Sequence, residues 1–310
     1  MRDRNETFRQ RMLQFMLVGA LVLTPLPGEV VDRIDAYSDE LGVHNDMLRV
    51  ARDYAKGSLG LALIDFDRSG YTQRWDASHS DVLHTSGALQ EAWQWCVDDP
   101  ALVAQWRALR DLPDGTLGRE VAKFYDARGF VFPGLPGSAP PLLAQHDWVH
   151  VLAGYGSTVE SELEVFGLIS RANDDPLAFS LLAMVISLFE TGHLAKGAGL
   201  FEYDRGHLSH AGMAVRFADA MRRGALCAAA NPPDGIDLFA HDWFNDADRP
   251  VADVRDELGI VPKSPRAIEA GSVTAWEPGG ISPFQYEAGR AAAARDGREY
   301  DSYGAVPATD

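Results

Sequence analysis

Residues 145–169 read QHDWVHVLAGYGSTVESELEVFGLI, and this stretch decides both the fold and the candidate site of the 310-residue chain. His146 and His150 are four residues apart, so both imidazoles lie on one face of a helix. Asp147 follows Leu143 by one helical turn and so lies on an apolar stripe. A carboxylate in that position needs a positive partner, because burying an unpaired charge is costly.

A turn broken by glycine, Gly154-Tyr-Gly156, ends this helix, and the capping-box sequence Ser157-Thr-Val-Glu160 begins the next one. Glu162 falls on the apolar face of the second helix, in line with Phe166. An antiparallel pair of helices would therefore bring Glu162 over the two histidines. The other acids of this helix, Glu160 and Glu164, share a face with Arg171, which we expect to be exposed.

Two imidazoles and two carboxylates suit Zn²⁺, Fe²⁺ or Mn²⁺. The sequence therefore predicts a metal site formed by four residues, His146, Asp147, His150 and Glu162. The alternative is a buried hydrogen-bonded cluster of the same residues without a metal.

A second histidine group consists of His193, His207 and His210. The spacing His207-x-x-His210 suits one helix face, but no acid lies at ligand spacing nearby in the sequence. We expect these residues to be surface groups or to support the metal ligands from outside.

The composition excludes several functions. A net charge of −17 argues against nucleic-acid binding and against general adhesion to anionic lipid. The two isolated cysteines, Cys96 and Cys227, indicate a reducing compartment. The apolar run Met12–Leu26 is shorter than a membrane span, so it predicts a buried or membrane-touching helix, with a signal or anchor as the alternative. A serine nucleophile elbow and a phosphate-binding glycine loop are both absent from the sequence.

Helical periodicity runs through nearly the whole chain, without the alternation typical of strands. We therefore predict an all-α fold, an irregular multi-helix bundle with a metal site between two consecutive helices. The expected helices cover residues 5–24, 30–41, 86–96, 100–110, 117–128, 176–191, 209–223 and 250–258, besides the two of the central stretch. Residues 65–76 begin like a calcium-binding loop, but we interpret them as a polar turn. Residues 263–310 are rich in Ala, Gly, Glu and Arg and predict a flexible or loosely docked tail.

The spaced motif His146-Asp147-x-x-His150, followed by eleven residues and Glu162, resembles the HDxxH-x11-E pattern of the coenzyme Q (ubiquinone) biosynthesis protein 4 family. The segment LPDGTLGREVAKF at 112–124 and the segment from Asp242 to Ile260 resemble the regions that flank this motif. The resemblance covers roughly residues 80–262. It divides the chain into an N-terminal helical extension (1–75), a helical core (76–262) and the tail.

The resemblance implies an all-α protein of ubiquinone biosynthesis at a membrane. Its divalent ion, zinc first and iron or manganese next, would be bound by His146, Asp147, His150 and Glu162. It implies a metal-dependent action on a prenylated aromatic precursor, including oxidative decarboxylation at ring carbon one. The prenyl tail would lie in an apolar groove formed by helices such as 176–191. Other quinone-biosynthesis proteins are the expected partners, a homodimer is an expected assembly, and the expected location is the cytoplasmic side of a bacterial inner membrane.

Two other functions stay open. The first is a non-catalytic, lipid-binding scaffold for quinone-biosynthesis enzymes, in which the metal is structural. The second is an HD-type metal-dependent hydrolase, which would need a further His and Asp. The histidines from His193 to His241, together with Asp242, are the candidates for these roles.

Overall fold

The computed structural model describes residues 1–21, 26–43, 48, 80–84, 98–139, 141–173, 182, 185 and 207–308. Within these ranges the chain is helical, and only two isolated β-bridges occur, Thr116 with Pro250 and Asn173 with Gly235. The all-α prediction is therefore confirmed. The predicted helix at 86–96, the loop at 65–76, His193 and Cys96 lie outside the described residues. Of the predicted helix at 176–191, only Leu182 and Val185 are described, both helical and buried.

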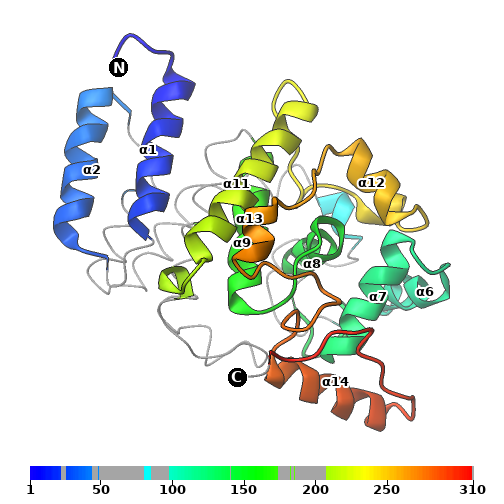
Figure 1. Ribbon diagram of the computed structural model, residues 1–310. Helices are drawn as coiled ribbons and strands as arrows, with labels where there is room; N and C mark the ends of the chain where they lie inside the picture. Colours follow the sequence, from blue (N-terminus) through cyan, green and yellow to red (C-terminus); the bar gives the residue numbers. More distant parts are fainter. Residues whose placement is uncertain are drawn as a thin grey trace.

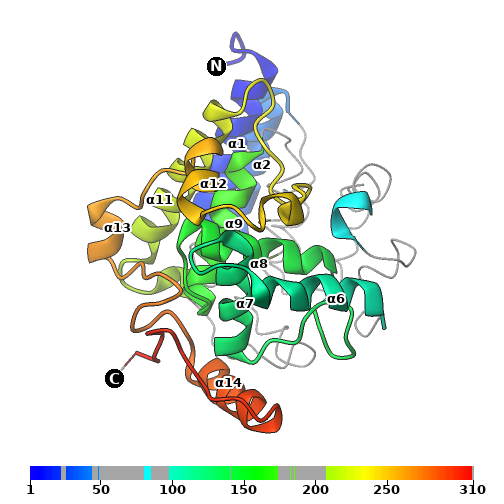
Figure 2. The same ribbon diagram turned by 90° about the vertical axis from the view of Figure 1, so that its right-hand side faces the viewer.

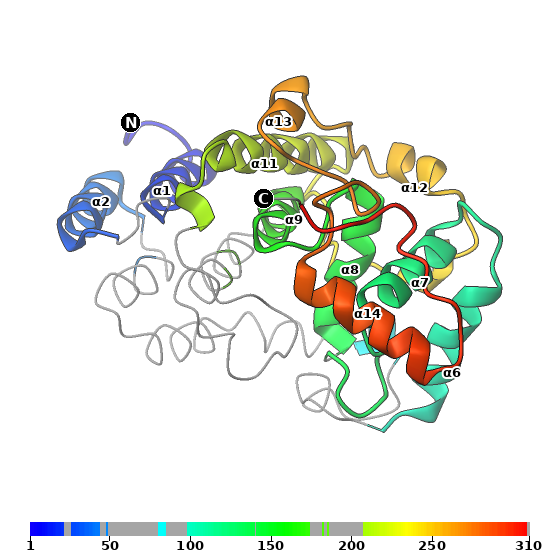
Figure 3. The ribbon, with the colours of Figure 1, turned by 60° about the horizontal axis from the view of Figure 1, so that its bottom comes forward.

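Two consecutive helices, α8 (Pro141–Ala153) and α9 (Val159–Ala172), form the centre of the molecule (Figures 1 and 3). The intervening turn begins at Gly154, whose φ of 71° lies in the left-handed region that favours glycine. The long helix α11 (Met213–Ala230) covers α9 on a second side. Their backbones approach closely at Gly224, where a Cβ would lie 2.2 Å from the carbonyl oxygen of Leu168.

Helix α7 (Leu117–Arg128) packs against α8 on the other side, and α12 (Val251–Glu257) also contacts α8. A cluster of aromatic rings fills the space beside α6 (Pro100–Ala108). Its members are Trp106, Tyr125, Phe132, Trp148 and Phe244. The described residues also form four short 3₁₀ turns: Ser80–Leu83, Leu109–Asp111, His207–Ser209 and Trp243–Asp246.

The N-terminal hairpin of α1 (Glu6–Leu21) and α2 (Gly28–Leu41) lies at one end of the molecule (Figure 1). As predicted, α2 ends at Leu41, and Gly42 caps it with a positive φ of 63°. The guanidinium group of Arg171 on α9 lies 5.7 Å from the ring centroid of Phe15, so α1 contacts the central helices. Among the described residues, no helix is long and apolar enough to cross a membrane.

The C-terminal residues differ from the prediction of a loosely docked tail. They form α13 (Pro265–Glu269) and α14 (Pro283–Arg295), and α14 packs beneath α7 (Figure 2). A Cβ on Gly289 would lie 2.1 Å from the carbonyl oxygen of Ala127, so the two backbones are in close contact. The prediction of a loose tail was wrong, because its small residues let the two helix backbones pack closely instead of leaving the segment flexible.

Candidate metal centre

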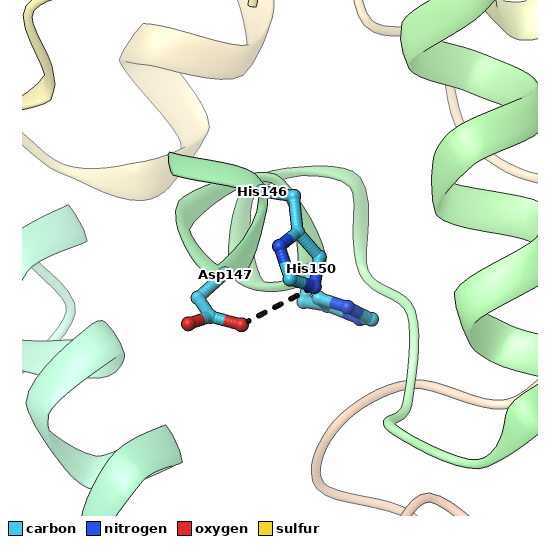
Figure 4. A group of neighbouring side chains, drawn as sticks. All are labelled: His146, Asp147 and His150. Carbon is cyan, nitrogen blue, oxygen red and sulfur yellow. Dashed lines mark ion pairs between the residues drawn. The ribbon is translucent and has the colours of Figure 1, made fainter. Parts of the chain in front are cut away.

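Helix α8 carries His146, Asp147 and His150, and one donor atom of each lies within 4.8 Å of the others. Figure 4 shows the three side chains projecting from this helix, with a dashed line for the ion pair between His146 and Asp147. Helix α9 brings Glu162 to the group. Its Oε2 lies 3.2 Å from Nε2 of His146 and 3.2 Å from Nε2 of His150. The structure thus brings together all four residues of the predicted site.

Backbone carbonyls hold both imidazoles in one orientation. Nδ1 of His150 donates to the carbonyl oxygen of Gly156 at 2.6 Å, and Nδ1 of His146 donates to that of Leu143. A carbonyl can only accept, so each Nδ1 carries a hydrogen. In a neutral imidazole the lone pair is then on Nε2, the atom that faces Glu162. Metal-binding histidines are commonly oriented in this way.

Asp147 is held by a residue that sequence reasoning missed. Its Oδ2 accepts a hydrogen bond from the hydroxyl of Tyr125 on α7, and its Oδ1 lies 3.5 Å from Nε2 of His146. Tyr125 is 22 residues before Asp147 in the chain, and the sequence pattern shows only that it faces inward. The carboxylate therefore keeps one oxygen for the cluster.

The group lies within the apolar core. His150 is 0% exposed, Glu162 3% and Asp147 6%, whereas the side chain of His146 is 12% exposed. The ring of Phe124 stacks on His150 at 5.3 Å between centroids, and the ring of Phe166 lies 5.1 Å from that of His146. The site is therefore most accessible at His146, although Phe166 packs against that ring, and Phe124 shields the site at His150.

Burial and the attraction between the imidazoles and carboxylates act in opposite directions on the pKa of each of these residues. Burial alone would lower the pKa of His146, but the carboxylates of Asp147 and Glu162 raise it to about 9. Burial alone would raise the pKa of Glu162, but the imidazoles of His150 and His146 lower it to about 2. For Asp147, burial prevails over the attraction of the two histidines and raises the pKa. Without a metal, the residues form a buried ion-pair cluster centred on a protonated His146.

A second group contains the acid that sequence reasoning did not find. His207 and His210 donate from Nδ1 to Oε1 of Glu160, at 2.8 and 3.0 Å. These three residues also have donor atoms within 4.8 Å of one another. Glu160 is 47 residues before His207, so no local spacing could reveal the contact.

The expectation that Glu160, Glu164 and Arg171 share an exposed face was wrong. Glu164 is 0% exposed and pairs with Arg216 of α11 at 2.7 Å, and Arg171 is 7% exposed. The cause is that α11 covers the face of α9 that carries Glu164, and Phe15 of α1 packs against Arg171. The predicted capping box is also not formed, since Thr158 is the N-cap residue and its side chain accepts no cap hydrogen bond.

Residues considered for an HD-type hydrolase are engaged elsewhere. Nε2 of His241 lies 2.6 Å from Oδ2 of Asp246, and Asp242 pairs with His84 at 2.7 Å. Neither side chain joins the His146 group, and the structure gives no support to this alternative.

No family model matches the chain, and no curated protein matches it. Among solved structures, it is similar to a protein from Nostoc punctiforme that is provisionally described as a ubiquinone biosynthesis protein. The alignment has 15% sequence identity and a TM-score of 0.35, and it covers 83% of this chain and 99% of the other. The family resemblance of the sequence motif therefore stays a prediction.

Proposed function

We propose that the chain is a metal-dependent enzyme whose divalent ion is held by His146, Asp147, His150 and Glu162. One observation carries the proposal. Both Nε2 atoms lie 3.2 Å from the same oxygen of Glu162, while both Nδ1 atoms are tied to backbone carbonyls. This donor set is typical of a metal site, and a hydrogen-bonded cluster would not require that both histidines present the same nitrogen.

The charges of the group also fit a divalent ion. Asp147 and Glu162 supply two negative charges, and two neutral imidazoles add none. A bound divalent cation would therefore leave the buried site neutral, which removes most of the cost of burying the carboxylates. Zinc is the ion we expect first, and iron or manganese would suit the same ligands.

The proposed substrate is a prenylated aromatic acid of the hydroxybenzoate type, in ubiquinone biosynthesis. This part rests on the sequence motif and its flanking segments rather than on the geometry. The bound ion would act as a Lewis acid on an oxygen of the substrate. The residues around it would contribute orientation and exclusion of water, through the hydroxyl of Tyr125 and the rings of Phe124 and Phe166.

The proposed reaction breaks a carbon–carbon bond. The ring carboxylate would leave as CO₂ from carbon one. In the oxidative form, one oxygen atom from O₂ would become a hydroxyl group on carbon one, and the other would leave as water, formed with two electrons from a reductant and two protons. We propose that this occurs at the cytoplasmic side of a bacterial inner membrane, together with other quinone-biosynthesis proteins.

A scaffold with a structural metal is the second candidate. It is favoured by the burial of the site and by its position between the two central helices, where an ion would lock α8 to α9. Its long-chain lipid would be bound without being changed.

Metal analysis of the purified protein and mass spectrometry of co-purified lipid provide the first test. We expect about one divalent ion per chain and a prenylated aromatic compound. The decisive comparison is between His146→Ala and the control His241→Ala, whose histidine lies outside the group. An enzyme predicts that His146→Ala stays folded in a thermal melt but abolishes quinone formation in a complemented host. A scaffold predicts that the same variant unfolds, and wild-type protein without metal contradicts both.

A further inference from the structure

A cavity of about 240 Å³ lies at the C-terminal end of α8, beside Gly154. Three cationic side chains line it: Arg223 from α11, Arg255 from α12, and Lys263. Only one carboxylate lines it, the exposed Glu277, which already accepts a hydrogen bond from the backbone of Thr274. The lining of the cavity therefore carries more positive than negative charge, in a chain whose net charge is −17.

The guanidinium groups at this cavity are fixed in place by the end of α8. Nη2 of Arg223 donates to the carbonyl oxygen of Ala153 at 2.8 Å, and Nε of Arg255 donates to that of Leu152 at 2.7 Å. These bonds satisfy the last carbonyls of the helix, but they do not neutralise the cations with a carboxylate.

Three buried donors of this cavity have no hydrogen-bond partner among the described residues. They are Nη1 of Arg223, Nζ of Lys263 and Oγ of Ser272. Arg223 is 1% exposed and Ser272 is 3% exposed, so solvent at the surface does not satisfy them. Leaving a buried donor without a partner is unfavourable. Three of them around one cavity indicate a ligand that accepts hydrogen bonds.

Two of these cations lie against the same aromatic ring. The ammonium group of Lys263 and the guanidinium group of Arg223 are each 4.9 Å from the ring centroid of Tyr155. Burial lowers the pKa of Lys263 to about 8, and the charge of Arg223 adds to the effect, although Glu164 and Glu277 oppose it. A bound anion would relieve the repulsion between them.

We propose that this cavity binds the phosphate group of a phosphorylated compound, with Arg223, Lys263 and Ser272 as the donors. A phosphate dianion suits this cationic lining, and its several oxygens can accept from three donors at once, whereas a carboxylate has two oxygens. The planar fork of an arginine also suits two phosphate oxygens at once. The compound can be soluble, or it can be a lipid with a phosphate headgroup, because both present the same chemistry. This site is independent of the proposed metal centre.

Calorimetric titration of the full-length protein with inorganic phosphate, at constant ionic strength, tests the site. We expect saturable binding with a Kd on the order of 1 mM or below, and at least roughly tenfold weaker binding in Lys263→Met. Methionine keeps most of the apolar stem, so its packing on Tyr155 is retained. The control is Arg266→Met, which removes the same charge from an exposed position outside the cavity and should bind like wild type.

Ser272→Ala provides a second variant if Lys263→Met does not fold, and we expect it to bind roughly threefold to tenfold more weakly than wild type. Vesicles of phosphatidylcholine with phosphatidic acid distinguish the two sources of the group. Vesicle binding that is lost in Lys263→Met places the phosphate on a lipid, and phosphate binding without vesicle binding places it on a soluble compound. The proposal is overturned if wild type shows no saturable phosphate binding, as expected of a cavity that holds water alone. It is also overturned if the folded variants bind as well as Arg266→Met.

Discussion

His146 is the residue at which metal and proton compete. Its pKa is raised to about 9 by Asp147 and Glu162, against the effect of burial, so the metal-free site holds a proton at neutral pH. Metal ligation needs the neutral imidazole. At pH 7 we therefore expect zinc to release about one proton from the coupled His146–Asp147 pair. Below pH 9 the apparent affinity should fall about tenfold for each pH unit because of this group. Calorimetry in two buffers of different ionisation enthalpy measures the proton release.

The control for this prediction is His241→Ala, because His241 lies outside the group. Zinc binding to this variant should release the same number of protons as zinc binding to wild type. Zinc binding to wild type with negligible proton release at pH 7 would contradict a protonated His146.

Tyr125 is the residue that positions Asp147. Tyr125→Phe removes the hydroxyl that donates to Oδ2 and leaves the buried carboxylate with one bond fewer. We expect a loss of about 1–3 kcal/mol in the free energy of unfolding and about 10–100-fold weaker zinc binding. Denaturant titration and competition with a zinc chelator measure the two effects. Tyr37→Phe on α2, where the side chain is 37% exposed, is the matched control and should change neither.

At the scale of helices, how much the sequence could predict depended on where the contacts lie along the chain. The faces of α8 and α9 follow from spacings of four residues, so the positions of His146, His150 and Glu162 could be predicted. The partner of Glu160 could not, because His207 comes from a different part of the chain. Glu164 was expected to be exposed, because helical periodicity does not show that α11 covers a second face of α9.

The contact between Glu160 and the two histidines ties the start of α9 to the turn at 207–209. Burial alone would raise the pKa of Glu160 above its ordinary 4.5. The hydrogen bonds from His207 and His210 nevertheless lower this pKa to about 2. A lowered carboxyl pKa stabilises the fold above pH 4.5, and this contribution is lost as the pH falls toward 2. At pH 7 the free energy of unfolding of Glu160→Gln should therefore be about 2–3 kcal/mol lower than that of wild type. This difference in stability should shrink as the pH falls from 4.5 to 2.

Urea titrations of the two proteins across this pH range measure the difference. The control is Glu6→Gln, whose carboxylate lies on the exposed face of α1. If the free energies of unfolding of wild type and Glu160→Gln differed by the same amount at every pH, the stabilising role of the ionised carboxylate would be contradicted.

At the scale of the whole molecule, the C-terminal segment holds the turn between the two site helices. Gln285 is 128 residues after Ser157, and its Nε2 donates to the carbonyl oxygen of Ser157 at 2.9 Å. The hydroxyl of Ser157 donates to Oε1 of Gln285 and accepts from Arg128. Composition alone predicted a loose tail here, because contacts made by backbone atoms and small residues leave no apolar pattern in the sequence.

Gln285→Ala should therefore affect the metal centre although residue 285 touches none of its four residues. We expect a loss of about 1–3 kcal/mol in stability, because the buried carbonyl oxygen of Ser157 loses its donor. The turn also carries Gly156, whose carbonyl orients His150. The zinc affinity of Gln285→Ala should therefore fall together with its stability. Hydrogen exchange at residues 154–158 should become faster in the metal-free protein. Gln10→Ala on the exposed face of α1 is the matched control. If Gln285→Ala lost stability while exchange in the turn and zinc affinity stayed unchanged, the C-terminal segment would be packing on the core without positioning the site.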